Sequence, residues 1–161
     1  MELLNIEIEN VRNLSREGKF DEAMLRAQQL VASYPSEIVV WRLRAFLYAS
    51  RGLLENAIQD LDHALSIEKS SVLYYTRGLY LFKKGDYRTA VVDFESALLS
   101  DKYGDETYAW YIHFARAEAF IKLGEKDKAL VDLEKVPDDF QAWTYALRTK
   151  TDLLADCNDG S

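Results

Sequence analysis

The sequence predicts an all-α protein built from four helix-turn-helix units and a C-terminal helix. The main observation is a glycine that stands five residues ahead of an alanine, once in each unit. The four segments read G-K-F-D-E-A, G-L-L-E-N-A, G-D-Y-R-T-A and G-E-K-D-K-A, and they begin at Gly18, Gly52, Gly85 and Gly124. Successive glycines are 34, 33 and 39 residues apart. A period near 34 residues indicates helical hairpins that stack and bury together what no single hairpin could bury.

Length and composition fit one helical domain. The chain has 161 residues, of which 48% are hydrophobic and 29% charged, with only two prolines and seven glycines. A chain of this size can bury a sizeable core, and no segment has the composition of a linker. We therefore expect a single domain over residues 1–161, with repeats at about 4–37, 38–70, 71–104 and 105–137.

Charge and cysteine content restrict the class of partner and the compartment. The chain carries 27 acidic and 20 basic residues, a formal charge of −7, which argues against nucleic acid or an anionic membrane as main partner. Cys157 is the only cysteine, as expected in a reducing compartment. The first ten residues do not resemble a signal peptide, and no apolar stretch reaches transmembrane length. We expect a cytoplasmic protein.

The first unit joins two amphipathic helical patterns across Gly18. Apolar residues recur at helical spacing before the glycine, for example Ile8 and Val11, and again after it, from Phe20 onward. Glycine suits this corner because it adopts positive φ without steric cost. Pro35 then ends the second helix of the unit.

The second and third units share a more specific pattern. It consists of an aromatic residue, a small residue, a large apolar residue, the turn glycine, and then alternating alanines and large residues. The second unit reads Trp41, Ala45, Tyr48, Gly52, Ala57, Leu61, Ala64, and the third reads Tyr74, Gly78, Leu81, Gly85, Tyr87, Ala90, Phe94, Ala97. This pattern resembles the tetratricopeptide repeat family over about residues 4–137. The resemblance implies a right-handed superhelical α-solenoid in which the first helices of the repeats line a concave groove.

The fourth unit departs from the regular spacing. Its glycine comes five residues late, so we expect either a longer loop near residues 100–105 or a first helix that starts early, near Asp105 or Glu106. Pro137 predicts a short eighth helix. The following Asp138-Asp139 predicts a capping helix over about 139–156. On that helix four apolar residues would seal the last pair and three polar ones would face water: Phe140, Trp143, Leu147 and Leu154, then Arg148, Lys150 and Asp152.

An arginine and an aspartate recur sixteen residues apart in three units. The pairs are Arg44 with Asp60, Arg77 with Asp93, and Arg116 with Asp132. They could be read as a ligand or catalytic constellation, but the resembling family commonly uses such pairs to brace its two helices. An arginine fork on a carboxylate can hold a partly buried pair of this kind. We therefore interpret the pairs as braces.

No residue pattern indicates catalysis or a cofactor. His63 and His113 are fifty residues apart and have no His, Cys or Glu companion at helical spacing, so a zinc site is not expected. Phosphate-binding loops and nucleophile motifs are absent from the sequence. The protein is not expected to be an enzyme.

The resemblance implies a partner-binding groove along the first helices. Carrying the family register across, the candidate residues are Arg12, Arg42, Phe46, Tyr75, Leu79, Phe82, Tyr111, Phe114, Glu118 and Lys122. Several are large and aromatic, and an excess of exposed apolar area is typical of a binding surface. The competing interpretation is that the long fourth unit or the ninth helix folds against part of this groove and fills it.

One known ligand mode of the family does not fit this chain. Members that clamp the carboxylate of a chaperone tail use Lys, Asn and Arg at five groove positions. The matching positions here hold Ile8, Arg12, Leu43, Val72 and Thr76, so almost none of the donors is present.

These observations predict a non-catalytic adaptor or scaffold that binds a peptide or partner protein in the groove. The alternative is a dedicated antidote or secretion chaperone that masks one toxin or effector, since an acidic surface attracts a basic cargo. Self-association through the solenoid ends is a third possibility.

Overall fold

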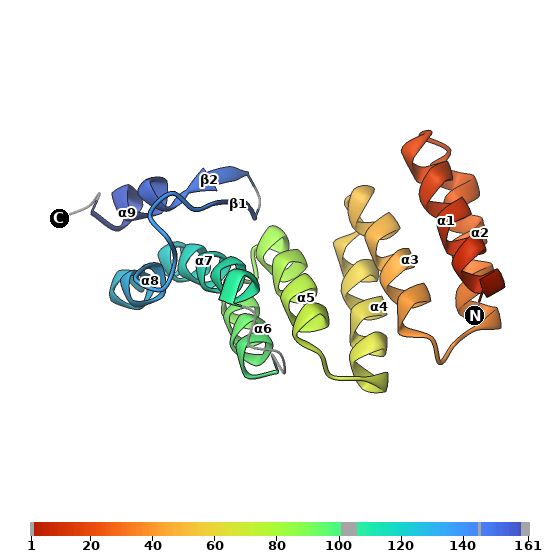
Figure 1. Ribbon diagram of the computed structural model, residues 1–161, viewed down its shortest axis with the longest axis horizontal. Coiled ribbons are helices and arrows are strands. Elements are labelled where there is room, and N and C mark those ends of the chain that lie inside the picture. Colours follow the sequence, from red (N-terminus) through yellow and green to blue (C-terminus); the bar gives the residue numbers. More distant parts are fainter. Residues whose placement is uncertain (1, 101–105, 145, 159–161) are drawn as a thin grey trace. The chain divides into compact units, whose positions relative to one another are not determined.

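The computed structural model describes residues 2–100, 106–144 and 146–158. Its contacts divide the chain into two units, Met1–Glu68 and Lys69–Ser161, and each unit is described by itself. The described residues form nine helices and one short hairpin of strands (Figure 1). The predicted all-α class is confirmed, with the hairpin as a small addition.

The N-terminal unit contains two helical hairpins. They are formed by α1 (Glu2–Arg16) with α2 (Phe20–Ser33), and by α3 (Ile38–Ser50) with α4 (Leu54–Ile67). The apolar residues of the first helical pattern, among them Ile8 and Val11, are buried in one core with residues of α2 and α3. Each hairpin is amphipathic, so it needs its neighbour to cover its apolar face.

The C-terminal unit continues with α5 (Ser71–Lys84), α6 (Tyr87–Leu99), α7 (Glu106–Lys122) and α8 (Lys126–Leu133). The early start of α7 agrees with one of the two expectations for the long fourth unit. The other, a longer loop near residues 100–105, falls largely on 101–105, outside the described residues. Helix α8 has only eight residues, as Pro137 predicts.

Glycine occupies all four predicted corners because each corner requires a positive φ angle. Gly18, Gly52, Gly85 and Gly124 have φ values of 76°, 76°, 93° and 76°, in the left-handed region. Gly85 ends α5, and its neighbour Asp86 accepts a 3.2 Å hydrogen bond from the Thr89 backbone N–H at the start of α6. The corner therefore stops one helix and caps the next.

The predicted capping helix over 139–156 is wrong in its first half. Residues Gln141–Trp143 (β1) and Leu147–Thr149 (β2) pair as antiparallel strands, with Ala142 opposite Arg148. Helix α9 begins only afterwards and spans Lys150–Asn158. A reciprocal cap sets its start, because the Thr149 N–H donates to the Asp152 carboxylate at 2.8 Å and the Asp152 N–H donates to the Thr149 hydroxyl at 3.1 Å.

The late helix start changes which side chains seal the end of the unit. Phe140 and Leu154 pack against the core of the fourth repeat, as expected, whereas Leu147 is exposed. Lys150 is buried and Arg148 is largely so, although both were expected to face water; Asp152 is exposed. The expectation for the Trp143 side chain lies outside the described residues.

Replacing Gly78 with alanine should destabilise the protein, although alanine is normally favoured in a helix. A Cβ atom at Gly78 would lie 2.6 Å from Cε1 of the buried Phe94 ring. This clash should outweigh the gain of about 1 kcal/mol in helix propensity and lower the free energy of unfolding by about 1–2 kcal/mol. Chemical denaturation of the variant provides the measurement.

The second repeat supplies the control for this prediction. At the equivalent positions it holds Ala45 and Leu61, an alanine facing a smaller core residue. The double variant Gly78→Ala with Phe94→Leu should therefore recover part of the loss. A single Gly78→Ala variant as stable as the wild type would contradict the close approach.

Candidate functional site

Three arginines on the first helices of their repeats each form a bidentate ion pair with an aspartate on the second helix. Each guanidinium donates two hydrogen bonds to one carboxylate, from Nε and Nη2, at 2.8 and 2.6 Å for Arg44–Asp60, 2.7 and 2.6 Å for Arg77–Asp93, and 2.7 and 2.7 Å for Arg116–Asp132. The carboxylate side chains are 6%, 2% and 1% exposed. The interpretation of these pairs as braces between helices is confirmed.

The pair in the fourth repeat has a third member. His113 Nδ1 lies 2.8 Å from Asp132 Oδ1. Burial acts to raise the pKa of Asp132, but hydrogen bonds from Arg116 and then His113 outweigh it, so the pKa lies below its ordinary value. Both carboxylate oxygens are engaged within one helical hairpin, so the aspartate serves the fold rather than a ligand.

The ten candidate binding residues fall into three classes of exposure. Five are exposed: Arg12, Arg42, Phe46, Tyr111 and Lys122. Two are half-buried, Tyr75 and Leu79. Three are buried, Phe82, Phe114 and Glu118. The expectation that these last three present accessible surface is wrong, because the chain's own side chains cover them.

The N-terminal unit keeps the most accessible of these residues. Phe46 on α3 is 55% exposed, and Arg42 lies one turn before it on the same helical face. Arg12 on α1 is engaged by Glu9 at 3.4 Å, and Arg16 contacts the same carboxylate at 2.9 Å. Hydrogen bonds from Arg16 and then Arg12 hold the pKa of Glu9 below its ordinary value. Within the described chain, Arg42 has no such partner.

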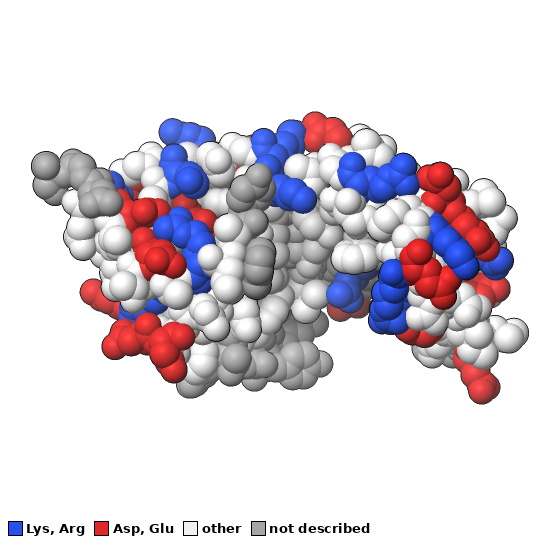
Figure 2. All heavy atoms as spheres, turned by 90° about the horizontal axis from the view of Figure 1, so that it is seen from above, with Lys and Arg blue, Asp and Glu red and all other residues white. Residues whose placement is uncertain are grey.

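Charge on this unit is mixed rather than segregated. Figure 2 shows Lys and Arg side chains interspersed with Asp and Glu over the N-terminal helices, at the right of that view. A surface of alternating sign does not offer the continuous basic track that phosphate backbones need. In the N-terminal unit, Arg42 beside the exposed Phe46 is therefore more distinctive than the overall charge.

In the C-terminal unit, Tyr75 and Phe82 belong to the packing of the helices. The Tyr75 ring lies 6.0 Å from that of Phe94 and 5.6 Å from that of Tyr108. Burial raises the pKa of Tyr75 above its usual range. Phe82 meets Tyr87 edge-on at 5.1 Å between centroids. These aromatic residues sit at groove register but fill space between elements of their own unit.

Phe140 covers the aromatic face of α7. Its ring centroid lies 4.9 Å from that of Tyr111, 5.5 Å from Phe114 and 6.3 Å from Trp110. The pairs with Tyr111 and Trp110 are edge-to-face, an arrangement that is favourable beyond simple burial. The segment after α8 therefore occupies the surface that the family register assigns to a partner.

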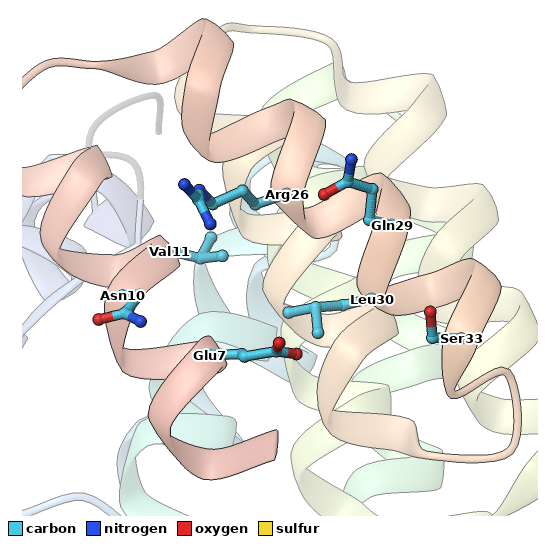
Figure 3. A pocket seen from close by; sticks show the side chains of 7 residues that line it. All are labelled: Glu7, Asn10, Val11, Arg26, Gln29, Leu30 and Ser33. Carbon is cyan, nitrogen blue, oxygen red and sulfur yellow. The ribbon is translucent and has the colours of Figure 1, made fainter. Parts of the chain in front are cut away.

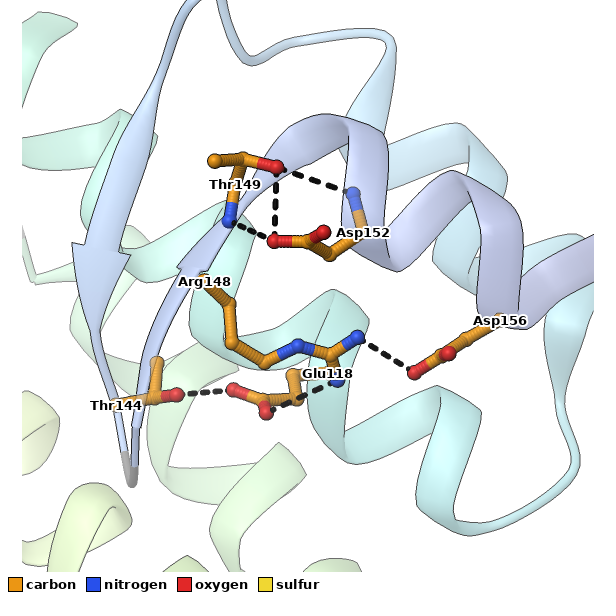
Figure 4. Close-up of polar contacts among 6 residues, drawn as sticks. All are labelled: Glu118, Thr144, Arg148, Thr149, Asp152 and Asp156. Carbon is orange, nitrogen blue, oxygen red and sulfur yellow. Dashed lines mark hydrogen bonds and ion pairs between the residues drawn. The ribbon is translucent and has the colours of Figure 1, made fainter.

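Glu118 is held by the same C-terminal segment (Figure 4). Its carboxylate accepts a hydrogen bond from the Thr144 hydroxyl and lies 3.5 Å from Arg148 Nη1. Arg148 Nη2 also donates to Asp156 at 2.7 Å, which ties β2 to α9. In the fourth repeat the C-terminal segment therefore covers part of the candidate surface, as the competing interpretation expects.

Comparison with known proteins identifies the repeats. A family model described as Tetratricopeptide repeat matches residues 75–145. Tetratricopeptide repeat protein 13 of Homo sapiens is 30% identical over 80 residues, which are 50% of this chain and 9% of that protein. The crystal structure of MamA protein matches 83% of this chain and 71% of that chain, with a TM-score of 0.71 and 21% identity.

The chain is a tetratricopeptide repeat protein. A further structural match is the Yersinia enterocolitica type III secretion chaperone SycD in complex with a peptide of the translocator YopD. It covers 76% of this chain and 96% of that chain, with a TM-score of 0.68 and 14% identity. Matches at these identities show a shared fold.

Most of the donors that clamp a chaperone tail are absent from this tetratricopeptide repeat protein. Of the five matching positions, Ile8 and Leu43 are buried apolar residues, and Val72 is an exposed apolar one. The Thr76 hydroxyl donates a hydrogen bond to the Val72 carbonyl oxygen at 2.7 Å. Only Arg12 could meet a carboxylate there, and it already contacts Glu9.

Among the described residues of this tetratricopeptide repeat protein, no three His, Cys, Asp or Glu side chains gather as a metal site would require. None of the described helices is both long enough and apolar enough to span a bilayer.

Proposed function

We propose that this tetratricopeptide repeat protein is a non-catalytic adaptor that binds a peptide or partner protein through exposed side chains on its first helices. The observation that carries the proposal is Phe46, an aromatic side chain more than half exposed on α3, one turn from Arg42. Tetratricopeptide repeat proteins typically mediate protein–protein interactions, and the SycD structure contains a bound peptide.

The chemistry of this surface favours an apolar side chain next to an acidic one. Phe46 supplies rigid apolar area at low entropic cost, as binding hot spots commonly do. Arg42 supplies a guanidinium that can grip a carboxylate with two donors. Arg12 contributes less than the sequence suggests, because binding an acidic partner would first require its separation from Glu9.

In the C-terminal unit, taken by itself, fewer of the candidate residues are accessible. Leu79 is half-buried, Lys122 is exposed, and Tyr111 is exposed beside its contact with Phe140. Phe114 and Glu118 cannot contact a partner there, because the C-terminal segment covers them. The single buried cysteine, Cys157, supports a reducing compartment, and we propose the cytoplasm.

A dedicated antidote or secretion chaperone is the second candidate. The likeness to SycD supports it, since the matching fold makes up 96% of that chaperone's chain. The two functions differ in strength and extent of binding. An adaptor should bind peptides with micromolar affinity, whereas an antidote should hold one folded protein with nanomolar affinity over a larger interface.

The test of the proposed surface uses two exposed residues of nearly equal exposure. Phe46→Ala, alone or with Arg42→Glu, should lower the affinity for a partner captured from native lysate by about tenfold or more, as expected for a hot spot. Leu25→Ala is the matched control, because Leu25 is 56% exposed but lies on the second helix α2. Isothermal titration calorimetry measures the affinities.

Melting temperatures of these variants should stay near that of the wild type. The proposal fails if Phe46→Ala binds as tightly as the wild type, or if Leu25→Ala loses as much affinity. A nanomolar complex with one folded protein that survives Phe46→Ala would favour the antidote instead.

A further inference from the structure

A hollow of about 360 Å³ opens between α1 and α2 in the N-terminal unit (Figure 3). Val11 and Leu30 form its apolar floor and are themselves buried. The remaining lining residues are polar or charged, and all are exposed: Glu7, Asn10, Arg26, Gln29 and Ser33. Neither Phe46 nor Arg42 lines the hollow, so the inference is separate from the proposed partner surface.

The polar groups of the hollow are largely unused within the chain. Among the described residues, the side chains of Glu7, Asn10 and Gln29 make no hydrogen bond or ion pair. Arg26 contacts Glu22 at 3.3 Å, with both side chains about half exposed. An exposed pair of this kind contributes little and exchanges partners readily.

Opposite charges lie toward opposite ends of the hollow. Figure 3 shows Arg26 reaching in from α2 at one end and Glu7 from α1 nearer the other, with Val11 and Leu30 between them. The charges of this distribution are complementary to those of a second copy, because a twofold axis across the middle brings Glu7 opposite Arg26 on both sides. The amides of Asn10 and Gln29 each donate and accept, so they too can pair with copies of themselves.

We propose that this hollow is the contact surface for a second copy of the chain in a twofold dimer. Glu7 of each copy faces Arg26 of the other, and the amide side chains bond across the axis. Leu3 lies one turn before Glu7 on the same face of α1 and is 75% exposed, so the contact also covers apolar area. A segment of one charge sign would meet repulsion at one end of the hollow, whereas a second copy places an opposite charge against each of these two residues.

The strength of the dimer follows from its chemistry. The contact consists of two ion pairs and amide bonds at the rim of the hollow, whose floor is already buried in the single chain, and the net charge of −7 opposes association. Association is therefore in the micromolar range and weakens as salt screens the pairs. Sedimentation velocity of the full chain over a concentration series detects such a dimer.

Charge exchange tests the pairing directly. Glu7→Arg leaves two arginines at each contact and Arg26→Glu leaves two glutamates, so each variant alone should associate at least about tenfold more weakly than the wild type. A mixture of the two variants pairs arginine with glutamate at both contacts and should recover association. Glu68→Arg is the matched control, since it reverses an exposed charge on another part of the unit.

Circular dichroism verifies that the variants fold, as expected for exposed positions. The proposal is overturned if the wild type sediments as a monomer at every concentration. It is also overturned if either variant associates as strongly as the wild type, or if the mixture associates no more than its components.

Discussion

Replacing Arg77 with alanine is expected to lower the free energy of unfolding by about 3–5 kcal/mol, because it leaves a buried carboxylate without its partner. The Asp93 side chain is 2% exposed and receives two hydrogen bonds from Arg77. Water cannot replace these bonds without entering the helical hairpin. Urea denaturation of the variant and the wild type measures the difference.

Two variants distinguish the buried pair from a general effect of losing a cation. Arg42→Ala removes an exposed arginine from the equivalent helix of the preceding repeat, and its effect should stay within about 0.5 kcal/mol. The double variant Arg77→Leu with Asp93→Leu removes both charges and should recover much of the lost stability. An Arg77→Ala variant that keeps its stability but loses a bound partner would assign the pair to binding instead.

Replacing Phe140 with alanine is also expected to lower the free energy of unfolding substantially. The change uncovers the α7 rings of Trp110, Tyr111 and Phe114 and leaves a space beside the core of the fourth repeat. We expect a loss of about 2–3 kcal/mol, somewhat less than for a fully buried phenylalanine. Thermal unfolding followed by circular dichroism measures the change.

Phe46→Ala is the control for this loss, since the same atoms are removed from an exposed site. It should leave stability nearly unchanged while weakening partner binding, the reverse of Phe140→Ala. Equal stability of the two variants would mean that the C-terminal segment rests on α7 without contributing to the fold.

The repeat pattern predicts most of the fold because it records local requirements. A glycine is needed wherever the corner has positive φ, so the four glycines mark the helix boundaries directly. The sixteen-residue spacing of arginine and aspartate records the pairing of two helices across that corner. Both signals are independent of what lies elsewhere in the chain.

The structure of the C-terminal segment cannot be predicted from local sequence signals, because it depends on contacts with residues far away in the chain. Two strands of three residues are not stable alone. Here Ala142 of β1 packs in the core of the fourth repeat. Thr144 in the turn and Arg148 of β2 both contact Glu118 on α7. The register of the repeats assigns Phe114 and Glu118 to the groove and gives no sign of a cover. One available signal was the spacing of Thr149 and Asp152, which marks the true start of α9.

The three arginine–aspartate braces have a consequence for how such a chain evolves. Each brace closes within one hairpin, so both of its charges are inherited together when that hairpin is duplicated, transplanted or deleted. An insertion or deletion that ends inside a hairpin, out of register with the other repeats, would instead leave a guanidinium or a carboxylate without its partner. Lineages of this protein should therefore gain and lose length in whole repeats.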